Sequence, residues 1–265
     1  MFPILFEFPK WIPLIGGHAL HTYGLMVAVA FLSGMLWVRF EAKRLGIDPQ
    51  KMMDLFFYVV VSAIVGSRLL YVFASVPRWW MDPAVFFRIW EGGLVFYGGL
   101  IGAVLVSVWY CRRHRFSFLT VADVFTPGIA LGHVFGRLGC FAAGCCYGLK
   151  APVGSFWSVV FPYNSAGIAP ANVPLYPVQL FESFGELVIF AVLFLFRKKK
   201  KFEGEVFVLY LTLYPVLRTI LEFFRGDKIR GFIIEGMLST SQFISMIWFT
   251  IALALWTTLR RRKTV

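Results

Sequence analysis

The sequence predicts an all-α, polytopic integral membrane protein with about seven transmembrane helices, and three observations support this fold class. Hydrophobic residues make up 59% of the 265 residues and charged residues only 15%, whereas soluble domains carry about 25%. The mean hydropathy is +0.74. The apolar residues gather in runs of about 20, the length that crosses a bilayer. This composition excludes a water-soluble globule and a disordered chain.

Seven apolar runs account for the expected helices. They cover residues 18–38, 55–75, 93–111, 119–141, 177–196, 206–224 and 240–259. Segment 1–17 contains one lysine and three prolines and has no small-residue cleavage site, so we expect it to be retained and not removed as a signal peptide. No repeat, low-complexity tract or flexible linker divides the chain, so we expect one membrane-embedded domain over residues 1–265.

The basic residues predict the orientation of the helices. A formal charge of +12 could indicate a nucleic-acid partner, but the basic residues cluster between the apolar runs. Taken alternately, the connections hold sixteen basic residues on one side and seven on the other. The positive-inside rule therefore places the N-terminus outside and the C-terminus in the cytoplasm, and a nucleic-acid partner loses its support.

Three arginines, Arg68, Arg137 and Arg218, lie within the apolar runs. An arginine at the centre of a bilayer costs about 2.5–3.5 kcal/mol on insertion scales, so each must face a protein-lined or hydrated interior. These arginines predict a polar, lipid-accessible cavity between the helices and are the first functional candidates. The alternative is a buried ion pair that only fixes the packing of helices.

Arg218 shares one face of its expected helix with other polar side chains. Tyr214 precedes it by one turn, Glu222 follows it by one turn, and Arg225 lies a further turn along. Two guanidinium groups with a carboxylate and a phenol suit the binding of an anionic group, with Glu222 orienting Arg218. An intrahelical salt bridge is the alternative.

Arg137 lies in a glycine-rich run. Glycines at positions 128, 132 and 136 repeat every four residues, a spacing that lets a neighbouring helix pack closely. Gly139, Gly144 and Gly148 then crowd the expected end of the helix. We expect the chain to break there and to free backbone groups beside Arg137, which is tolerated at membrane depth only around a cavity. A polar cavity with an arginine is the expected site for a lipid phosphate.

Three of the four cysteines, Cys140, Cys145 and Cys146, follow Arg137, and His133 precedes it by one turn. The C-x4-C-C spacing is not that of a zinc site, there is no second cysteine pair, and the neighbouring arginine would repel a cation. We therefore predict no metal site. Buried thiols are expected instead, and those on the outer side could oxidise.

Six motifs occur in order along the chain. They are His21-Thr-Tyr23-Gly-Leu-Met, Gly66-Ser-Arg68, Trp90-Glu91-Gly-Gly-Leu-Val-Phe-Tyr97-Gly-Gly-Leu-Ile-Gly, Gly136-Arg137-Leu-Gly139, Tyr176-Pro177-Val-Gln179-Leu-Phe-Glu182 and Arg218-x3-Glu222-Phe-Phe-Arg225. Together they resemble the bacterial prolipoprotein diacylglyceryl transferases over essentially the whole chain. The Gly-Arg-Leu-Gly segment with its flanking glycines is the most specific of the six.

The resemblance implies a transferase of the bacterial inner membrane with its active site toward the outer face. Such an enzyme moves the diacylglyceryl group of phosphatidylglycerol onto the lipobox cysteine thiol in the signal peptide of a prolipoprotein. The reaction forms a thioether and releases glycerol phosphate. The resemblance implies no cofactor.

The resemblance also implies roles for individual residues. Arg137, flanked by Gly136 and Gly139, would bind the phosphatidylglycerol head group, and Arg218, oriented by Glu222, would stabilise the departing phosphate. Tyr23, Gln179 and Glu182 would line the same chamber. Tyr214 and Arg225 are substrate-binding candidates because of their spacing from Arg218. Arg68 would be structural.

The chain departs from the family at several polar positions. Tyr97 and Tyr176 stand where many members have histidine, Cys140 replaces an asparagine and Cys145 replaces an acidic residue. The usual candidate for the general base is therefore missing.

Three routes for the thiol proton stay open. The base could be the phenol of Tyr97, whose ionisation nearby arginines would favour, or a carboxylate such as Glu91 or Glu182, or no residue at all. The alternative function is a divergent, non-catalytic lipid-binding protein or a transporter. A transporter usually shows paired broken helices, and only one broken element is expected here.

Overall fold

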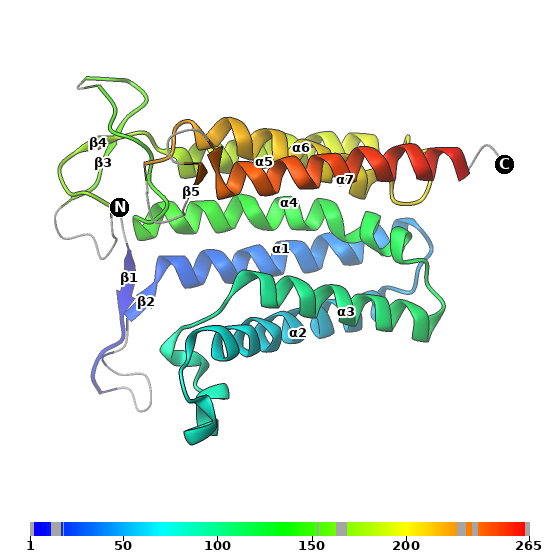
Figure 1. The fold of residues 1–265 in the computed structure, drawn as a ribbon, viewed down its shortest axis with the longest axis horizontal. Coiled ribbons are helices and arrows are strands. Elements are labelled where there is room, and N and C mark those ends of the chain that lie inside the picture. The colour runs from blue at the N-terminus through cyan, green and yellow to red at the C-terminus, as the bar shows by residue number, and fades with distance from the viewer. Residues whose placement is uncertain are drawn as a thin grey trace. The chain divides into compact units, whose positions relative to one another are not determined.

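A computed structural model describes residues 3–11, 17, 19–152, 154–162, 169–226, 232–234 and 238–262 of the chain. Within these residues, seven α-helices form the fold (Figure 1). They are α1 (Thr22–Arg44), α2 (Pro49–Ser75), α3 (Phe96–His114), α4 (Phe118–Ala143), α5 (Val178–Phe196), α6 (Glu205–Glu222) and α7 (Thr240–Arg262). Each corresponds to one of the seven predicted apolar runs.

Five of the described helices, α1, α2, α4, α5 and α7, are long and apolar enough to cross a membrane. The other two are less apolar because α3 ends in two arginines and a histidine, and α6 carries two glutamates and Arg218. The all-α, multi-pass membrane fold expected from the sequence is thereby confirmed. Lys228, Arg230 and Lys263, which enter the predicted charge count, lie outside the described residues.

The observed helices extend beyond some of the apolar runs. α1 continues to Arg44 and α2 begins at Pro49, so charged and polar residues form the ends of both helices. The side chain of Asp48 accepts a hydrogen bond from the backbone N–H of Gln50 at 2.9 Å and caps α2, which opens with proline. The apolar pattern of the sequence does not by itself indicate helix ends that consist of polar residues.

Short antiparallel hairpins and 3₁₀ turns join the helices. The paired strands are β1 (Ile4–Glu7) with β2 (Ala19–His21), β3 (Val159–Val160) with β4 (Pro174–Leu175), and β5 (Phe232–Ile234) with β6 (Leu238–Ser239). The 3₁₀ turns are η1 (Trp79–Met81), η2 (Pro83–Phe86) and η3 (Ile89–Glu91). The sequence did not indicate the strands, because two to four residues are too few to show an alternating pattern.

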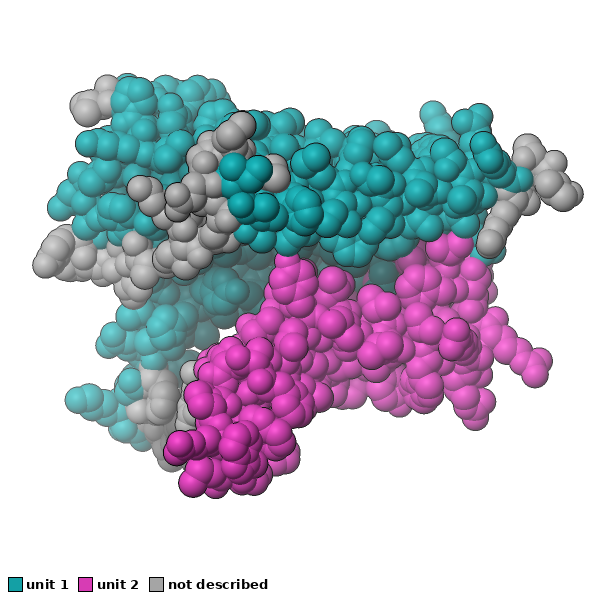
Figure 2. All heavy atoms as spheres, in the orientation of Figure 1, with its two compact units in different colours: residues 1–36, 125–265 teal, residues 37–124 magenta. Residues whose placement is uncertain are grey.

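The chain divides into two compact units (Figure 2). Unit 1 comprises residues 1–36 and 125–265, and unit 2 comprises residues 37–124. The boundaries fall inside α1 and α4, so each of these helices contributes to both units. The expectation of a single domain stays a prediction.

In unit 1, an apolar cluster supports the polar side chains described below. It consists of Ala130 on α4, Ile189 and Leu193 on α5, and Val206 and Tyr210 on α6, all buried. The ring of Tyr210 packs in this cluster, and its hydroxyl group contacts His133 on α4. The apolar core of unit 1 therefore ends where a polar network begins.

In unit 2, glycines let α2 and α3 approach closely. A Cβ atom added at Gly66 would collide with the carbonyl oxygen of Gly98, and one added at Gly102 would collide with the carbonyl oxygen of Ser62. Close backbone contact through small residues is a usual way for membrane helices to pack.

Arg68, on α2, is 3% exposed and holds the chain segment that connects α2 to α3. Its guanidinium group donates hydrogen bonds to the carbonyl oxygens of Val85, at 2.6 and 3.1 Å, and of Arg88, at 2.8 Å. It also donates to the carbonyl oxygens of Gly92 and Gly93. The five N–H groups of arginine suit such a set of acceptors, and these contacts support the structural role that the resemblance implies.

Replacing Arg68 by glutamine should therefore destabilise unit 2. The substitution leaves several partly buried carbonyl oxygens without their donors, and we expect the free energy of unfolding to fall by about 2 kcal/mol. Denaturant unfolding of the purified protein in detergent measures this change. Arg113→Gln, at an exposed position near the end of α3, is the matched control. Equal stability of the two variants would contradict the role of Arg68.

Candidate active site

Three helices of unit 1 each present a row of polar side chains at helical spacing. On α4 the row consists of His133, Arg137 and Cys140; on α5 of Gln179, Glu182 and Glu186; on α6 of Tyr210, Tyr214, Arg218 and Glu222. Residues three or four positions apart share one face of a helix, so each row points in one direction. The contacts below show that the three rows meet.

Glu182 links two of the arginines. Its Oε1 lies 2.9 Å from the guanidinium of Arg137, and its Oε2 lies 3.9 Å from the guanidinium of Arg225. The side chains of Glu182 and Arg225 are 2% and 4% exposed, whereas that of Arg137 is 23% exposed. One face of Arg137 therefore remains accessible after its ion pair has formed.

Arg218 forms the ion pair that the spacing predicted. Its guanidinium lies 2.9 Å from Oε2 of Glu222, one turn along α6, and both side chains are 10% exposed. The guanidinium also donates a hydrogen bond to Oγ of Ser241 on α7 at 3.0 Å. Glu222 and Ser241 thus hold Arg218 from two helices.

The position of Arg225 corrects the predicted stripe. α6 ends at Glu222, so Arg225 is not a further turn of that helix. It lies instead in an extended segment that forms an antiparallel bridge with Gly148. This bridge brings Arg225 to Glu182 and thereby to Arg137, a contact that no intrahelical spacing could indicate.

His133 contacts a buried carboxylate on α5, a pairing that was not predicted from the sequence. Its Nδ1 lies 2.8 Å from Oε1 of Glu186 and 3.1 Å from the hydroxyl oxygen of Tyr210. The imidazole also lies against the ring of Tyr214, with 5.5 Å between ring centroids. From the sequence, His133 was considered only as a possible metal ligand. The available signal was its place one turn before Arg137, opposite a helix with two glutamates four residues apart.

The predicted break at the end of α4 is present and occurs at Gly144. Gly144 adopts φ +68°, and Cys146 adopts φ +57°, a left-handed conformation that is uncommon outside glycine. The helix continues through Gly139, so only the later glycines mark its end. Beyond the break, the N–H of Cys145 bonds to the carbonyl oxygen of Cys140 at 3.1 Å.

The break gathers three thiols beside the arginines. The sulfur atoms of Cys140, Cys145 and Cys146 all lie within 4.8 Å of one another. Among the described residues this group has three ligands, whereas a structural zinc site takes four. We therefore assign no metal to the cluster and treat it as a group of free thiols.

The pKa values of the two thiols beyond the helix, Cys145 and Cys146, are shifted in opposite directions. Hydrogen bonds from Cys140 and Cys145 lower the pKa of Cys146, and Arg225 and Arg137 lower it further, against the effect of burial. Hydrogen bonding to Cys140 and Cys146 raises the pKa of Cys145, and burial raises it as well. Cys146 is therefore the more readily ionised of the two thiols.

Tyr23 and Gln179 border the same loop. A Cβ atom added at Gly139 would lie 3.2 Å from the ring of Tyr23, which places the first turn of α1 against α4. Gln179 donates a hydrogen bond to the carbonyl oxygen of Cys145 at 2.7 Å, and its Oε1 is buried without a hydrogen-bond partner among the described residues. A Cβ atom at Gly136 would meet no atom within 4 Å, so Gly136 borders open space.

Three other candidates lie in unit 2. Tyr97 is the second residue of α3 and is 49% exposed. Arg68 binds backbone carbonyl groups, as described above. The side chain of Glu91 lies outside the described residues.

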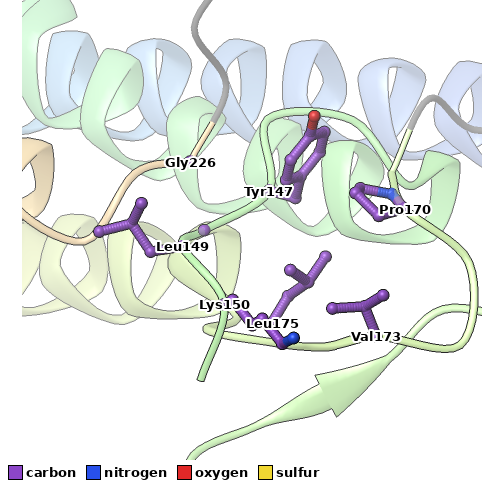
Figure 3. Close-up of a pocket in the computed structure, with 8 residues that line it drawn as sticks. Tyr147, Leu149, Lys150, Pro170, Val173, Leu175 and Gly226 are labelled. Atoms are coloured by element: carbon purple, nitrogen blue, oxygen red, sulfur yellow. The ribbon is translucent and has the colours of Figure 1, made fainter. Parts of the chain in front are cut away.

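A pocket of about 490 Å³ adjoins the loop that follows the thiols (Figure 3). It is lined by Tyr147, Gly148, Leu149, Lys150, Pro170, Val173, Leu175 and Gly226. Backbone hydrogen bonds from Gly148 to Tyr176, at 3.1 Å, and from Gly226 to Tyr147, at 3.2 Å, fix its wall. Lys150 is the one charged residue in this lining, so the pocket offers mainly apolar surface next to the charged site.

Comparison with known proteins identifies related chains. The family model described as prolipoprotein diacylglyceryl transferase matches residues 9–258. The phosphatidylglycerol–prolipoprotein diacylglyceryl transferase 2 of Clostridium perfringens is 35% identical over 232 residues, 88% of each chain. The corresponding transferase of Clostridium tetani is 34% identical over 99% of this chain and 100% of its own. That of Bordetella avium is 35% identical over 98% of each chain.

The acidities of the thiols predict selective alkylation. Near pH 6, iodoacetamide should modify Cys146 at least about tenfold faster than Cys145, because the thiolate is the reactive form. Mass spectrometry of proteolytic peptides gives the rate at each site. Cys111, which is 2% exposed, should remain unmodified in the folded protein. Faster modification of Cys145 than of Cys146 would contradict the assignment of the charge.

Proposed function

Because this chain belongs to the prolipoprotein diacylglyceryl transferase family, we propose that it transfers the diacylglyceryl group of phosphatidylglycerol to prolipoproteins. It is a transferase by that membership. A non-catalytic lipid-binding protein or a transporter is not favoured, since relatives that match over most of both chains are named as transferases.

The acceptor in this proposal is the lipobox cysteine thiol of the prolipoprotein signal peptide. The thiol must displace a phosphate monoester from an unactivated CH₂ group, so negative charge develops on the leaving oxygen. Cations held in a site of low dielectric constant stabilise this charge most effectively. The reaction therefore requires fixed arginines beside the scissile bond.

The buried cluster of Arg137, Glu182 and Arg225 carries the proposal. With Arg218 and Glu222, it brings three guanidinium groups together, and their N–H groups that do not bind the two carboxylates are available to contact a phosphate. Glu182 holds Arg137 by one edge, and the partly exposed guanidinium can present its remaining N–H groups to the phosphatidylglycerol head group. Gly136 borders open space, and Gly139 lets the ring of Tyr23 pack against α4.

Arg218 is the group we assign to the departing phosphate. Glu222 and Ser241 fix its orientation, and Tyr214 lies one turn before it on the same face of α6. A preoriented cation pays no reorganisation energy when charge develops.

Gln179 and Tyr23 complete the substrate contacts in the proposal. The unpartnered Oε1 of Gln179 can accept a hydrogen bond from a hydroxyl group of the glycerol head group, which would satisfy a buried acceptor. Tyr23 lies beside Gly139 and can donate its phenolic hydrogen to the phosphate.

We place the enzyme in the bacterial inner membrane, with its active site toward the outer face. The charge asymmetry of the connections supports an outer N-terminus and a cytoplasmic C-terminus. The active-site loop then faces the side on which the lipobox cysteine of an exported chain emerges.

A mass-gain assay tests the function directly. A lipobox peptide incubated with the purified protein and phosphatidylglycerol vesicles should gain the mass of one diacylglyceryl group, with release of glycerol phosphate. A peptide with serine in place of the lipobox cysteine is the control. Absence of mass gain with the cysteine peptide would exclude the transferase function.

Substitutions at Arg137 test the head-group contact. Arg137→Ala should reduce turnover by about a hundredfold or more, because charge-assisted hydrogen bonds to the phosphate are lost. Arg137→Lys should rescue poorly, since a point charge cannot reproduce the bidentate fork of arginine. The assay is the mass gain of the lipobox peptide, with membrane insertion verified for each variant. Full activity of both variants would refute the contact.

A double-mutant cycle tests the coupling of Arg218 to Glu222. Arg218→Ala and Glu222→Ala should each reduce turnover, and the double variant should lose less than the sum of the two losses in activation free energy. This result is expected because Glu222 acts by orienting Arg218. Strict additivity in the cycle would show that the two residues act independently.

A further inference from the structure

His133 and Glu186 form a pair in the candidate active site, and the proposed function gives neither residue a role. Nδ1 of His133 lies 2.8 Å from Oε1 of Glu186. The glutamate side chain is 1% exposed, whereas the histidine side chain is 41% exposed. The buried carboxylate therefore contacts one edge of an imidazole that remains accessible.

The contact determines which nitrogen carries hydrogen. An ionised carboxylate can only accept hydrogen bonds, so Nδ1 of His133 must donate the hydrogen to Glu186. Tyr210 lies 3.1 Å from the same nitrogen and can take a share of this hydrogen. In neutral His133 the other nitrogen, Nε2, is then a proton acceptor.

The pair lies next to the arginine cluster. His133 and Arg137 are one turn apart on α4, and Glu186 and Glu182 are one turn apart on α5. Arg137 pairs with Glu182, and His133 pairs with Glu186, so the two ion pairs form successive layers. Tyr214 lies against the imidazole and precedes Arg218 by one turn.

We propose that His133 is the general base that takes the proton of the acceptor thiol, and that Glu186 is the residue that positions it. The inference rests on the proposed transferase function. It gives this chain a base in place of the histidine that many family members carry at position 97.

The proposed step is a nucleophilic substitution at carbon coupled to removal of the thiol proton. Nε2 of His133 removes the proton of the S–H group, and the sulfur forms a C–S bond with the terminal CH₂ of the diacylglyceryl group. The C–O bond to phosphate breaks, and its electron pair leaves with glycerol phosphate. The imidazolium, stabilised by Glu186, then returns the proton to the departing phosphate or to water.

Glu182, another candidate base, fits this role less well. One of its oxygens lies against Arg137 and the other against Arg225, so both already contact cations. Tyr97, the third candidate, is tested by its own variant below.

The experiment compares a cysteine lipobox peptide with the same peptide carrying selenocysteine. A selenol ionises below neutral pH, so it does not need a base, whereas a thiol ionises near pH 8.5. The variant is His133→Gln in the full-length protein with phosphatidylglycerol vesicles, and turnover is read as mass gain. His114→Gln, at the end of α3 in unit 2, is the matched control.

We expect His133→Gln to lose about a hundredfold in turnover of the cysteine peptide near pH 7, the usual scale of general-base help. With the selenocysteine peptide it should remain within about fivefold of the parent. His114→Gln should match the parent with both peptides.

Three results would overturn the proposal. Turnover of the cysteine peptide by His133→Gln within about threefold of the parent would show that no base acts there. Equal losses with both peptides would show a structural role. The base would be Tyr97 if Tyr97→Phe lost turnover of the cysteine peptide but kept turnover of the selenocysteine peptide, while His133→Gln was unaffected. If the parent modifies neither peptide, the proposed function fails instead.

Glu186→Gln tests the positioning role. Loss of the carboxylate that contacts Nδ1 should reduce turnover of the cysteine peptide, because the imidazole is no longer held in place. Turnover of the selenocysteine peptide should stay within about fivefold of the parent, since the selenol needs no base. Equal losses with both peptides would refute the positioning role.

Discussion

The site depends on one constraint: charged side chains within an apolar helix bundle must each find a partner. Burying an unpaired charge costs several kcal/mol, and a buried pair requires close geometry to compensate for the lost solvation. In unit 1 the partners come from different helices, with Glu182 and Glu186 on α5 serving Arg137 and His133 on α4. The ion pairs therefore fix the relative register of α4 and α5, and the same contacts set the positions of the functional groups.

The break at the end of α4 gives the site its opening. At Gly144 and Cys146 the backbone takes left-handed conformations, and the following loop bonds back to Gln179 and to the segment that carries Arg225. Irregular backbone at membrane depth requires such internal partners, because lipid offers no hydrogen bonds. The loop thus gathers three thiols near Arg137 and Arg225, and these arginines contribute to the lowered pKa of Cys146.

In the proposed mechanism, both layers of the polar network serve one reaction. Displacement of phosphate by a thiol needs a cation at the leaving oxygen and a proton acceptor at the sulfur. The arginines, oriented by carboxylates, are the proposed cations, and the imidazole of His133, oriented by Glu186, is the proposed proton acceptor. Tyr214 touches the imidazole and lies on the same helical face as Arg218, so it joins the two layers.

The sequence by itself determined the helical membrane fold, the family and the three intramembrane arginines, because composition and apolar runs report local properties. It also predicted the pair of Arg218 and Glu222, since neighbours four residues apart meet on any helix. It could not predict that Arg225 leaves α6 and reaches Glu182, or that His133 meets Glu186, which lies 53 residues away in the chain. Only the tertiary structure decided these contacts, because the register between helices follows from side-chain packing and charge pairing and not from the spacing within one helix.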